Sequence, residues 1–289
     1  MKIFKKKNYG QIYTAPLMFW ITVFFVIPIL IIFVFSFLKK SYTGGVLPQF
    51  SLDAYGALAN PQFVKVVLKT LFISIVASIF TVLLAIPTSY YIARSKYKDI
   101  LLFLIIIPFW TNFLIRIYAW IAILGNNGFV NNFLINIGLI EEHVQLLYNQ
   151  WAVIIVIVYA YLPFAILPLY STIEKFDFSL LEAARDLGAT KFQSIMKVMI
   201  PNIKPGITTA VLFTFIPAFG NYAIPEIVGG KDSVMVGNII ANQLRVVRNW
   251  PLSASISVVL TVLTTIGVLL FVQLNKSKTD EIRKIKEDV

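Results

Sequence analysis

Six long apolar stretches limit what this chain can fold into. Residues 15–38, 70–93, 151–170, 205–225 and 251–274 contain no charged side chain, and residues 100–124 contain one, Arg116. A helix needs roughly 20 apolar residues to cross a bilayer. The chain is 58% hydrophobic and only 13% charged, whereas soluble domains are about 25% charged. We therefore expect an all-α integral membrane protein with six transmembrane helices.

The first stretch follows Lys5, Lys6 and Lys7, as the apolar part of a secretory signal would. That part of a signal is only about 7–15 residues long and ends at a small-residue cleavage site. Residues 15–38 are longer, and no such site follows them. We expect this stretch to remain as a membrane helix.

Basic residues predict the orientation, because cytoplasmic loops carry an excess of Lys and Arg. If the N-terminus is cytoplasmic, 17 of the 25 basic residues fall in cytoplasmic segments and seven fall outside, with Arg116 in a helix. We expect both termini and the segment 171–204 in the cytoplasm. No repeat or separate soluble domain is visible, so residues 1–289 are interpreted as one transmembrane domain.

Side chains suited to metal binding are scarce in the sequence. There is no cysteine, and the single histidine, His143, stands beside Glu141 and Glu142 in a Gly- and Asn-rich outer loop. A protein metal site needs more ligands than this. We interpret His143 as a surface residue and expect neither a metal nor a cofactor.

A nucleotide-binding loop is also missing. The only Gly-Lys pair, Gly230-Lys231, is followed by Asp232, and Pro225 stands where the phosphate-binding pattern requires glycine. We therefore expect that the chain is not an enzyme and does not hydrolyse ATP itself.

The segment 179–201 predicts two short helices that meet at an elbow. Residues 179–182 (Ser-Leu-Leu-Glu) and 190–193 (Thr-Lys-Phe-Gln) both fit the capping box, in which side chains satisfy the first backbone N–H groups of a helix. Gly188 is expected to end the first helix, and Pro201 and Pro205 the second. Spacing alone leaves two interpretations open: an amphipathic loop resting on the membrane, or a rigid knob that docks into a partner.

Within this segment a family resemblance becomes visible. Glu182, Ala183 and Ala184, then Gly188, then Val198-Met199-Ile200-Pro201, resemble the EAA motif of ABC importer permeases. Val198 and Ile200 replace the usual Ile and Leu of that motif. The resemblance implies a type I importer permease whose residues Glu182, Ala183, Ala184, Gly188 and Pro201 belong to a coupling segment that contacts a cytoplasmic ATPase.

Further matches resemble the spermidine/putrescine branch of that family. They are residues 108–112 (Pro-Phe-Trp-Thr-Asn), 114–118, 170–175, 181–189, 237–240 and 248–251. This resemblance implies polyamine import by a channel that this chain forms with a second, homologous permease. It also implies a cytoplasmic ABC ATPase dimer and an external substrate-binding protein as partners.

Four residues are candidates for the interior of such a channel. Glu226 follows a helix loosened by proline and glycine, with Tyr222 one turn before it, and broken helices can line a water-filled cavity. An ordinary interfacial glutamate is the alternative. Trp110 could stack on a cation, although interfacial aromatic belts also explain it. Arg116 is interpreted as a structural intramembrane charge rather than a substrate contact.

Other classes of function remain open from the residues alone. A related importer could carry an iron complex or an oxyanion, and the outer segments form no acidic funnel that would select polyamines by charge. A membrane-embedded enzyme is a different class, but the HExxH pattern of zinc proteases is absent and cysteine chemistry is impossible. A structural membrane scaffold is the remaining alternative.

Overall fold

A computed structural model describes the backbone of residues 9–287 and the side chains of residues 14–275. The chain divides into two compact units. One comprises Met1–Pro61 with Ile240–Leu263, and the other comprises Gln62–Ile239 with Thr264–Val289. Helices α14 (Val236–Arg245) and α15 (Trp250–Glu287) contribute residues to both.

The first unit contains the first apolar stretch and a small β-hairpin. Its elements are α1 (Tyr9–Ile21), the π-helical turn η1 (Thr22–Val26), α2 (Ile27–Phe35), β1 (Leu38–Lys40), β2 (Val46–Phe50), α3 (Asp53–Gly56) and η2 (Ala57–Ala59). The two strands pair antiparallel. Phe37 stacks on Phe50 with ring centroids 6.0 Å apart, and the N–H of Gly45 donates to the carbonyl of Arg248 at 3.0 Å. The hairpin is an addition to the all-α fold that the sequence predicts.

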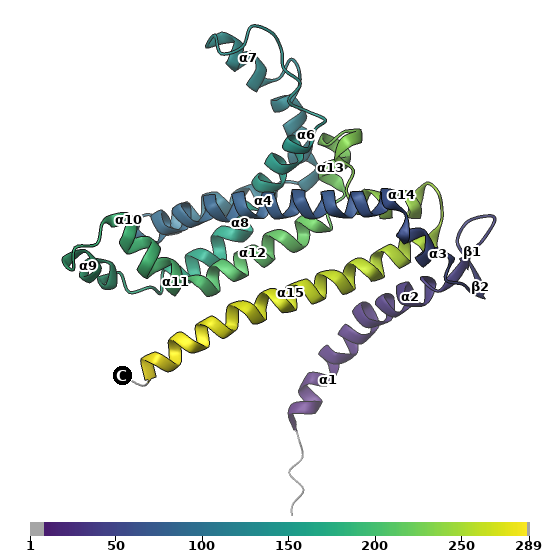
Figure 1. The fold of residues 1–289 in the computed structure, drawn as a ribbon, viewed down its shortest axis with the longest axis horizontal. Helices are drawn as coiled ribbons and strands as arrows, with labels where there is room; N and C mark the ends of the chain where they lie inside the picture. The colour runs from purple at the N-terminus through teal and green to yellow at the C-terminus, as the bar shows by residue number, and fades with distance from the viewer. Residues whose placement is uncertain (1–8, 288–289) are drawn as a thin grey trace, which may run out of the picture. The chain divides into compact units, whose positions relative to one another are not determined.

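The second unit is built around three long helices that lie side by side, α4 (Pro61–Arg94), α8 (Gln150–Ile173) and α12 (Lys204–Phe219) (Figure 1). The remaining elements are α5 (Lys98–Ile106), η3 (Ile107–Trp110), α6 (Phe113–Leu124), α7 (Phe129–Asn136), α9 (Ser179–Asp186), α10 (Lys191–Ser194), η4 (Ile195–Met199), α11 (Ile200–Asn202), α13 (Ala223–Val228) and η5 (Lys231–Ser233).

Small residues on α4 let the long helices approach closely. Ala77, Ala85 and Ser89 on this helix are fully buried. The Ser89 hydroxyl donates to the Ile166 carbonyl of α8 at 3.1 Å, and the Ser78 hydroxyl donates to a carbonyl one turn back. Helices in lipid associate through such small residues and interhelical hydrogen bonds, because there is no hydrophobic driving force between apolar side chains that lipid already surrounds.

Gly206 permits the contact between α8 and α12. A Cβ atom at this position would lie 2.5 Å from Oγ1 and 2.8 Å from Cβ of Thr172 on α8. Thr172 cannot simply rotate away, because it is β-branched and its hydroxyl donates to the Pro168 carbonyl at 2.9 Å. The two helices can therefore meet at this depth only with glycine at position 206.

Within the part of the chain that the structure describes, five helices are long and apolar enough to cross a membrane. They are Thr14–Phe35, Pro61–Arg94, Phe113–Asn136, Gln150–Ile173 and Trp250–Asn275, and the bent pair Lys191–Asn202 and Lys204–Phe219 makes a sixth if it is counted as one span. This agrees with the expected helical membrane fold.

The third expected stretch, 100–124, is not one continuous helix. It is interrupted at Thr111 and Asn112, after Pro108, and the Asn112 side chain accepts the N–H of Leu114 at 2.8 Å to start α6. The fifth stretch, 205–225, also breaks, because α12 ends at Phe219 and α13 begins at Ala223. The length of an apolar stretch predicts that it can lie in a membrane, but it does not predict where its helix breaks.

We predict that Gly206→Ala destabilises the protein by about 1–3 kcal/mol through overpacking against Thr172. The thermal unfolding temperature of the detergent-solubilised protein would measure this loss. Gly267→Ala on α15 is the matched control, because a Cβ atom there meets no atom within 4 Å. Equal unfolding temperatures for the two variants would contradict the packing argument.

Candidate functional site

The elbow segment is anchored by one buried residue on its first helix. Leu181 of α9 is only 2% exposed and lies in a core with Met199, Ile203 and Ile173. Glu182 and Ala183, the next two residues, are exposed. A buried leucine therefore fixes α9 on the bundle while Glu182 and Ala183 of the motif face outward.

The elbow itself is formed by Gly188. Its φ angle is +90°, in the left-handed region that favours glycine, and the N–H of Ala189 donates to the Ala184 carbonyl at 3.0 Å, as in a Schellman helix ending. Thr190 and Gln193 then form a reciprocal capping box at 3.2 and 3.0 Å. The predicted stop at Gly188 and the second capping box are confirmed.

Two local predictions about this segment are wrong. Ser179 does not cap α9: it is the first helical residue, and its N–H donates to Oδ1 of Asp177 at 3.0 Å. This bonding to Ser179 lowers the pKa of Asp177. Pro201 does not end the second helix either, since it lies within the continuous helical run Lys191–Asn202, one residue before that run ends.

Sequence reasoning missed the apolar surface of the elbow. Leu187 is 90% exposed and Phe192 is 68% exposed, and they flank Gly188 on either side. A large apolar side chain beside the exposed motif residues marks an interaction surface. Both residues lay in the motif region, but their exposure depends on which way the elbow turns.

Residues 174–178, which lead into the elbow and form its base, are held to neighbouring helices by polar and cation–π contacts. Lys98 at the start of α5 donates to Oε1 of Glu174 at 2.6 Å, and the Tyr170 hydroxyl donates to the same oxygen at 2.7 Å. The bond from Lys98 lowers the pKa of Glu174, and the bond to Glu174 raises the pKa of Lys98. Arg94 of α4 lies over the Phe178 ring, 5.5 Å from its centroid.

The broken fifth span is stabilised by a buried asparagine. Asn221, 8% exposed, donates from Nδ2 to the Tyr161 hydroxyl at 2.8 Å and accepts the N–H of Ile224 at 2.9 Å. The Tyr161 hydroxyl donates onward to the Pro217 carbonyl at 3.3 Å. These side chains replace the backbone hydrogen bonds that the helix loses at the break.

A second asparagine joins two of the predicted site residues. Asn238 on α14, also 8% exposed, donates from Nδ2 to Oε2 of Glu226 at 2.7 Å and to the backbone carbonyl of Tyr222 at 2.9 Å. The Glu226 carboxylate and the Tyr222 carbonyl therefore converge beside the helix break. Sequence reasoning did not assign Asn238, and only its proximity in the fold reveals it.

Trp110 and Arg116 lie at the other broken span. Trp110 is 76% exposed and its ring meets the edge of Phe103 on α5, with centroids 5.8 Å apart. The Arg116 guanidinium lies 5.1 Å from the centroid of Phe109 and 5.7 Å from that of Phe113, and its Nε is buried with no hydrogen-bond partner. These cation–π contacts fit the predicted structural role. Trp110 packs against Phe103 of α5, whereas Tyr222 and Glu226 are both hydrogen-bonded to Asn238.

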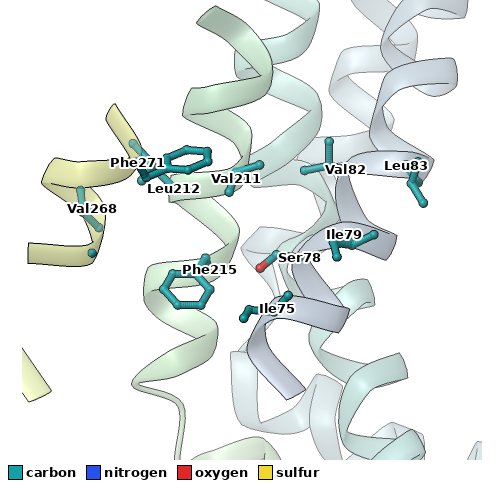
Figure 2. A pocket seen from close by; sticks show the side chains of 11 residues that line it. Ile75, Ser78, Ile79, Val82, Leu83, Val211, Leu212, Phe215, Val268 and Phe271 are labelled. Carbon is teal, nitrogen blue, oxygen red and sulfur yellow. The ribbon is translucent and has the colours of Figure 1, made fainter. Parts of the chain in front are cut away.

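An apolar cavity of about 460 Å³ lies elsewhere in the same unit (Figure 2). It is lined by side chains of α4, α12 and α15, among them Ile79, Phe215 and Phe271. Ser78 is its one hydroxyl-bearing residue, and that hydroxyl already donates to Ser74. Such a lining offers nothing to balance the charge of an ammonium ion, so the cavity is not the candidate site.

A multi-pass helical bundle whose spans break beside polar side chains has the architecture of a membrane transport protein.

His143 is exposed, and no group of three or more His, Cys, Asp or Glu among the described side chains could hold a metal ion.

Sequence comparison identifies the family. Residues 83–279 match the family described as binding-protein-dependent transport system inner membrane component. The chain is 38% identical over 278 residues to the spermidine/putrescine transport system permease protein PotB of Haemophilus influenzae, covering 96% of this chain and 97% of that protein. PotB of Escherichia coli is 38% identical over 254 residues, covering 87% and 92%. The chain therefore belongs to this family of ABC transporter permease subunits of the inner membrane.

A solved structure agrees on the fold. A bacterial ABC transporter involved in the import of the acidic polysaccharide alginate has a chain with a TM-score of 0.75, covering 94% of this chain and 96% of that one. The sequence identity is 18%, so the likeness concerns the fold alone.

We predict that Glu174→Gln loosens the base of the elbow in a pH-dependent way. Because the folded-state pKa of Glu174 lies below its ordinary value of 4.5, its pairing stabilises above that value and is lost as the pH falls through the folded-state pKa. The pKa of Lys98 is raised, so its ammonium group stays charged over the range in which Glu174 titrates. Both side chains are partly exposed, so the effect is small.

Amide hydrogen exchange over residues 94–101 and 174–180 measures this contribution. Exchange should be faster in Glu174→Gln than in the wild type at neutral pH, and the ratio should approach one once the pH has fallen below the lowered folded-state pKa of Glu174. Asp186→Asn serves as the control. A difference that persists at the acid end would mean that the ion pair is not its cause.

Proposed function

We propose that this chain is a channel-forming permease subunit of an ATP-driven importer for polyamines. The observation that carries the proposal is the 38% identity to PotB spermidine/putrescine permeases over nearly the whole chain. The Glu226 carboxylate, held by Asn238 beside a helix break, supports it, because an ammonium ion needs such oxygens to replace its water. In this proposal residues 1–289 act as one transmembrane domain.

The proposed assembly contains four kinds of partner. They are a second, PotC-like permease, a cytoplasmic ABC ATPase dimer, an external substrate-binding protein and the polyamine itself. A related solved structure is that of a bacterial alginate ABC transporter in complex with a periplasmic protein that carries an alginate pentasaccharide. A binding protein of this kind would deliver polyamine to the outer side of the channel.

Coupling is proposed to run through the elbow at residues 179–201. Closure of the ATPase dimer on ATP would move the knob formed by Glu182, Ala183, Ala184 and Gly188, with Leu187 and Phe192 inserted into the ATPase. The rigid capping at Gly188 and Thr190 and the buried Leu181 support this role, because they transmit a push without bending. The bundle would then switch from inward-facing to outward-facing.

We predict that Gly188→Asp weakens ATPase association or uncouples ATP hydrolysis from uptake. An aspartate at φ +90° costs about 1–2 kcal/mol of backbone strain and adds charge at the docking tip. Co-purification of the ATPase and the ratio of ATP hydrolysed to substrate imported would be measured together.

Gly138→Asp is the matched control, because Gly138 has φ +72° and, like Gly188, nothing within 4 Å of its Cβ position, but lies in the predicted outer loop. It should leave both quantities unchanged. Normal coupling in Gly188→Asp would remove the docking assignment.

The topology follows from the excess of basic residues in the proposed cytoplasmic segments. A single cysteine at Ser277, whose side chain lies outside the described residues, should be labelled by an impermeant thiol reagent only after the membrane is opened. The chain has no native cysteine to interfere. Labelling from outside intact cells would contradict cytoplasmic placement of the C-terminus.

We predict that Glu226→Gln lowers polyamine uptake about tenfold or more, since a lost charge-assisted contact costs roughly 1.5–3 kcal/mol. Spermidine uptake should fall more than putrescine uptake, because spermidine carries more positive charge. Initial rates in vesicles with the complete complex give the measurement, and ATPase co-purification shows that assembly is intact.

Glu142→Gln, an exposed carboxylate of the outer loop, is the control and should transport normally. If Glu226→Gln carries both polyamines at the wild-type rate, Glu226 is an interfacial residue and the path lies elsewhere.

A further inference from the structure

The amide of Asn238 has all its hydrogen-bonding groups engaged. Its two N–H bonds go to Oε2 of Glu226 and to the Tyr222 carbonyl, at 2.7 and 2.9 Å, and its Oδ1 accepts the N–H of Met235 at 3.1 Å. The opposite amide orientation would set Oδ1 against two acceptors and the NH₂ group against an N–H donor, so only this orientation satisfies every group.

The position of Asn238 is itself fixed by three neighbouring contacts. The N–H of Val236, at the start of α14, donates to Oγ1 of Thr70 on α4 at 3.0 Å. Lys69 on the same helix donates to the Asp232 carbonyl at 2.5 Å. A Cβ atom at Gly237 would lie 2.7 Å from the Asn221 carbonyl, so glycine lets α14 rest directly on the helix break.

Glu226 differs from Asn238 in its surroundings. It is exposed, on the short helix α13, whereas Asn238 is buried. An exposed carboxylate on a short helix normally samples several rotamers, and ordering it costs free energy when a ligand binds. The bond from a buried and fixed amide removes much of that freedom in advance.

We propose that Asn238 is the positioning residue that preorganises the Glu226 carboxylate as a site for a substrate ammonium group. The Tyr222 carbonyl accepts from Asn238 and from the N–H of Glu226 at 3.1 Å, so it anchors the carboxylate's surroundings and is not itself a ligand. Oε2 of Glu226 and the Tyr222 carbonyl oxygen both accept from Nδ2 of Asn238, so these two hydrogen bonds keep the carboxylate close to the helix break. Oε1 of Glu226 remains for the ammonium. This inference rests on the proposed polyamine function and adds the residue that sets its charge selectivity.

A double-mutant cycle tests whether Asn238 acts through Glu226. The variants are Asn238→Ala, Glu226→Ala and the double substitution, with Asn242→Ala, an exposed asparagine one turn later on α14, as the control. The readout is the ratio of spermidine to putrescine uptake rates in one preparation of the complete complex. The amount of assembled complex cancels in that ratio, so a merely structural defect does not move it.

We expect Asn238→Ala to lower this ratio roughly threefold to tenfold, as loss of a hydrogen bond to a charged group does. In the Glu226→Ala background the same substitution should change the ratio by less than about twofold. Asn242→Ala should leave it unchanged. If Asn238→Ala does not assemble, Asn238→Ser, which keeps an oxygen that can accept the Met235 N–H, takes its place in the cycle.

The outcomes separate this inference from the function on which it rests. If Glu226→Ala leaves both uptake rates and their ratio at the wild-type values, the proposed substrate path fails and this inference fails with it. If Glu226→Ala lowers the ratio but the position 238 substitution has the same effect in both backgrounds, or none, the positioning role alone is overturned. Failure of both position 238 variants to assemble would make Asn238 a folding residue and would also overturn it.

Discussion

A backbone polar group in lipid must find a hydrogen-bond partner within the protein, because the hydrocarbon offers none. The breaks in the spans of this chain depend on that constraint. At the break after Phe219, Asn221 and Tyr161 supply the missing partners, and Asn238 satisfies the Tyr222 carbonyl. At the break after Trp110, Asn112 caps the following helix. Polar side chains therefore gather where the helices stop, and the same side chains create polar surroundings in which a charged solute could rest.

The long helices provide the rigid frame that these breaks need. Small residues on α4 and Gly206 on α12 let backbones approach closely, and buried hydroxyls donate to carbonyls of their own or a neighbouring helix. The same frame carries the elbow, because Leu181 lies in a core shared with α4, α8 and α12. A displacement of the elbow would thus be passed to helices that also hold the broken span, which is the physical requirement for coupling.

The sequence was sufficient for the class of fold and for the elbow, because both depend on local patterns. Uncharged length predicts membrane helices, and Gly188 with the Thr190–Gln193 box predicts a stop and a restart. The sequence was insufficient where contacts between distant residues determine the local structure. Asp177 rather than Ser179 receives the first N–H of α9, and the apolar stretch 100–124 does not reveal its break at Asn112. Asn238 is 12 residues from Glu226 in the sequence, and no local pattern pairs them.

We propose that this permease forms a channel for polyamines whose opening is driven by a separate ATPase. Reconstitution tests it most directly: the chain, a second permease, the ATPase and the external binding protein are placed in proteoliposomes, and radiolabelled spermidine uptake is followed with and without ATP. The account predicts ATP-dependent accumulation that unlabelled putrescine inhibits and unlabelled maltose does not. Accumulation that needs no ATP, or an assembled and ATP-hydrolysing complex that imports no polyamine, would contradict it.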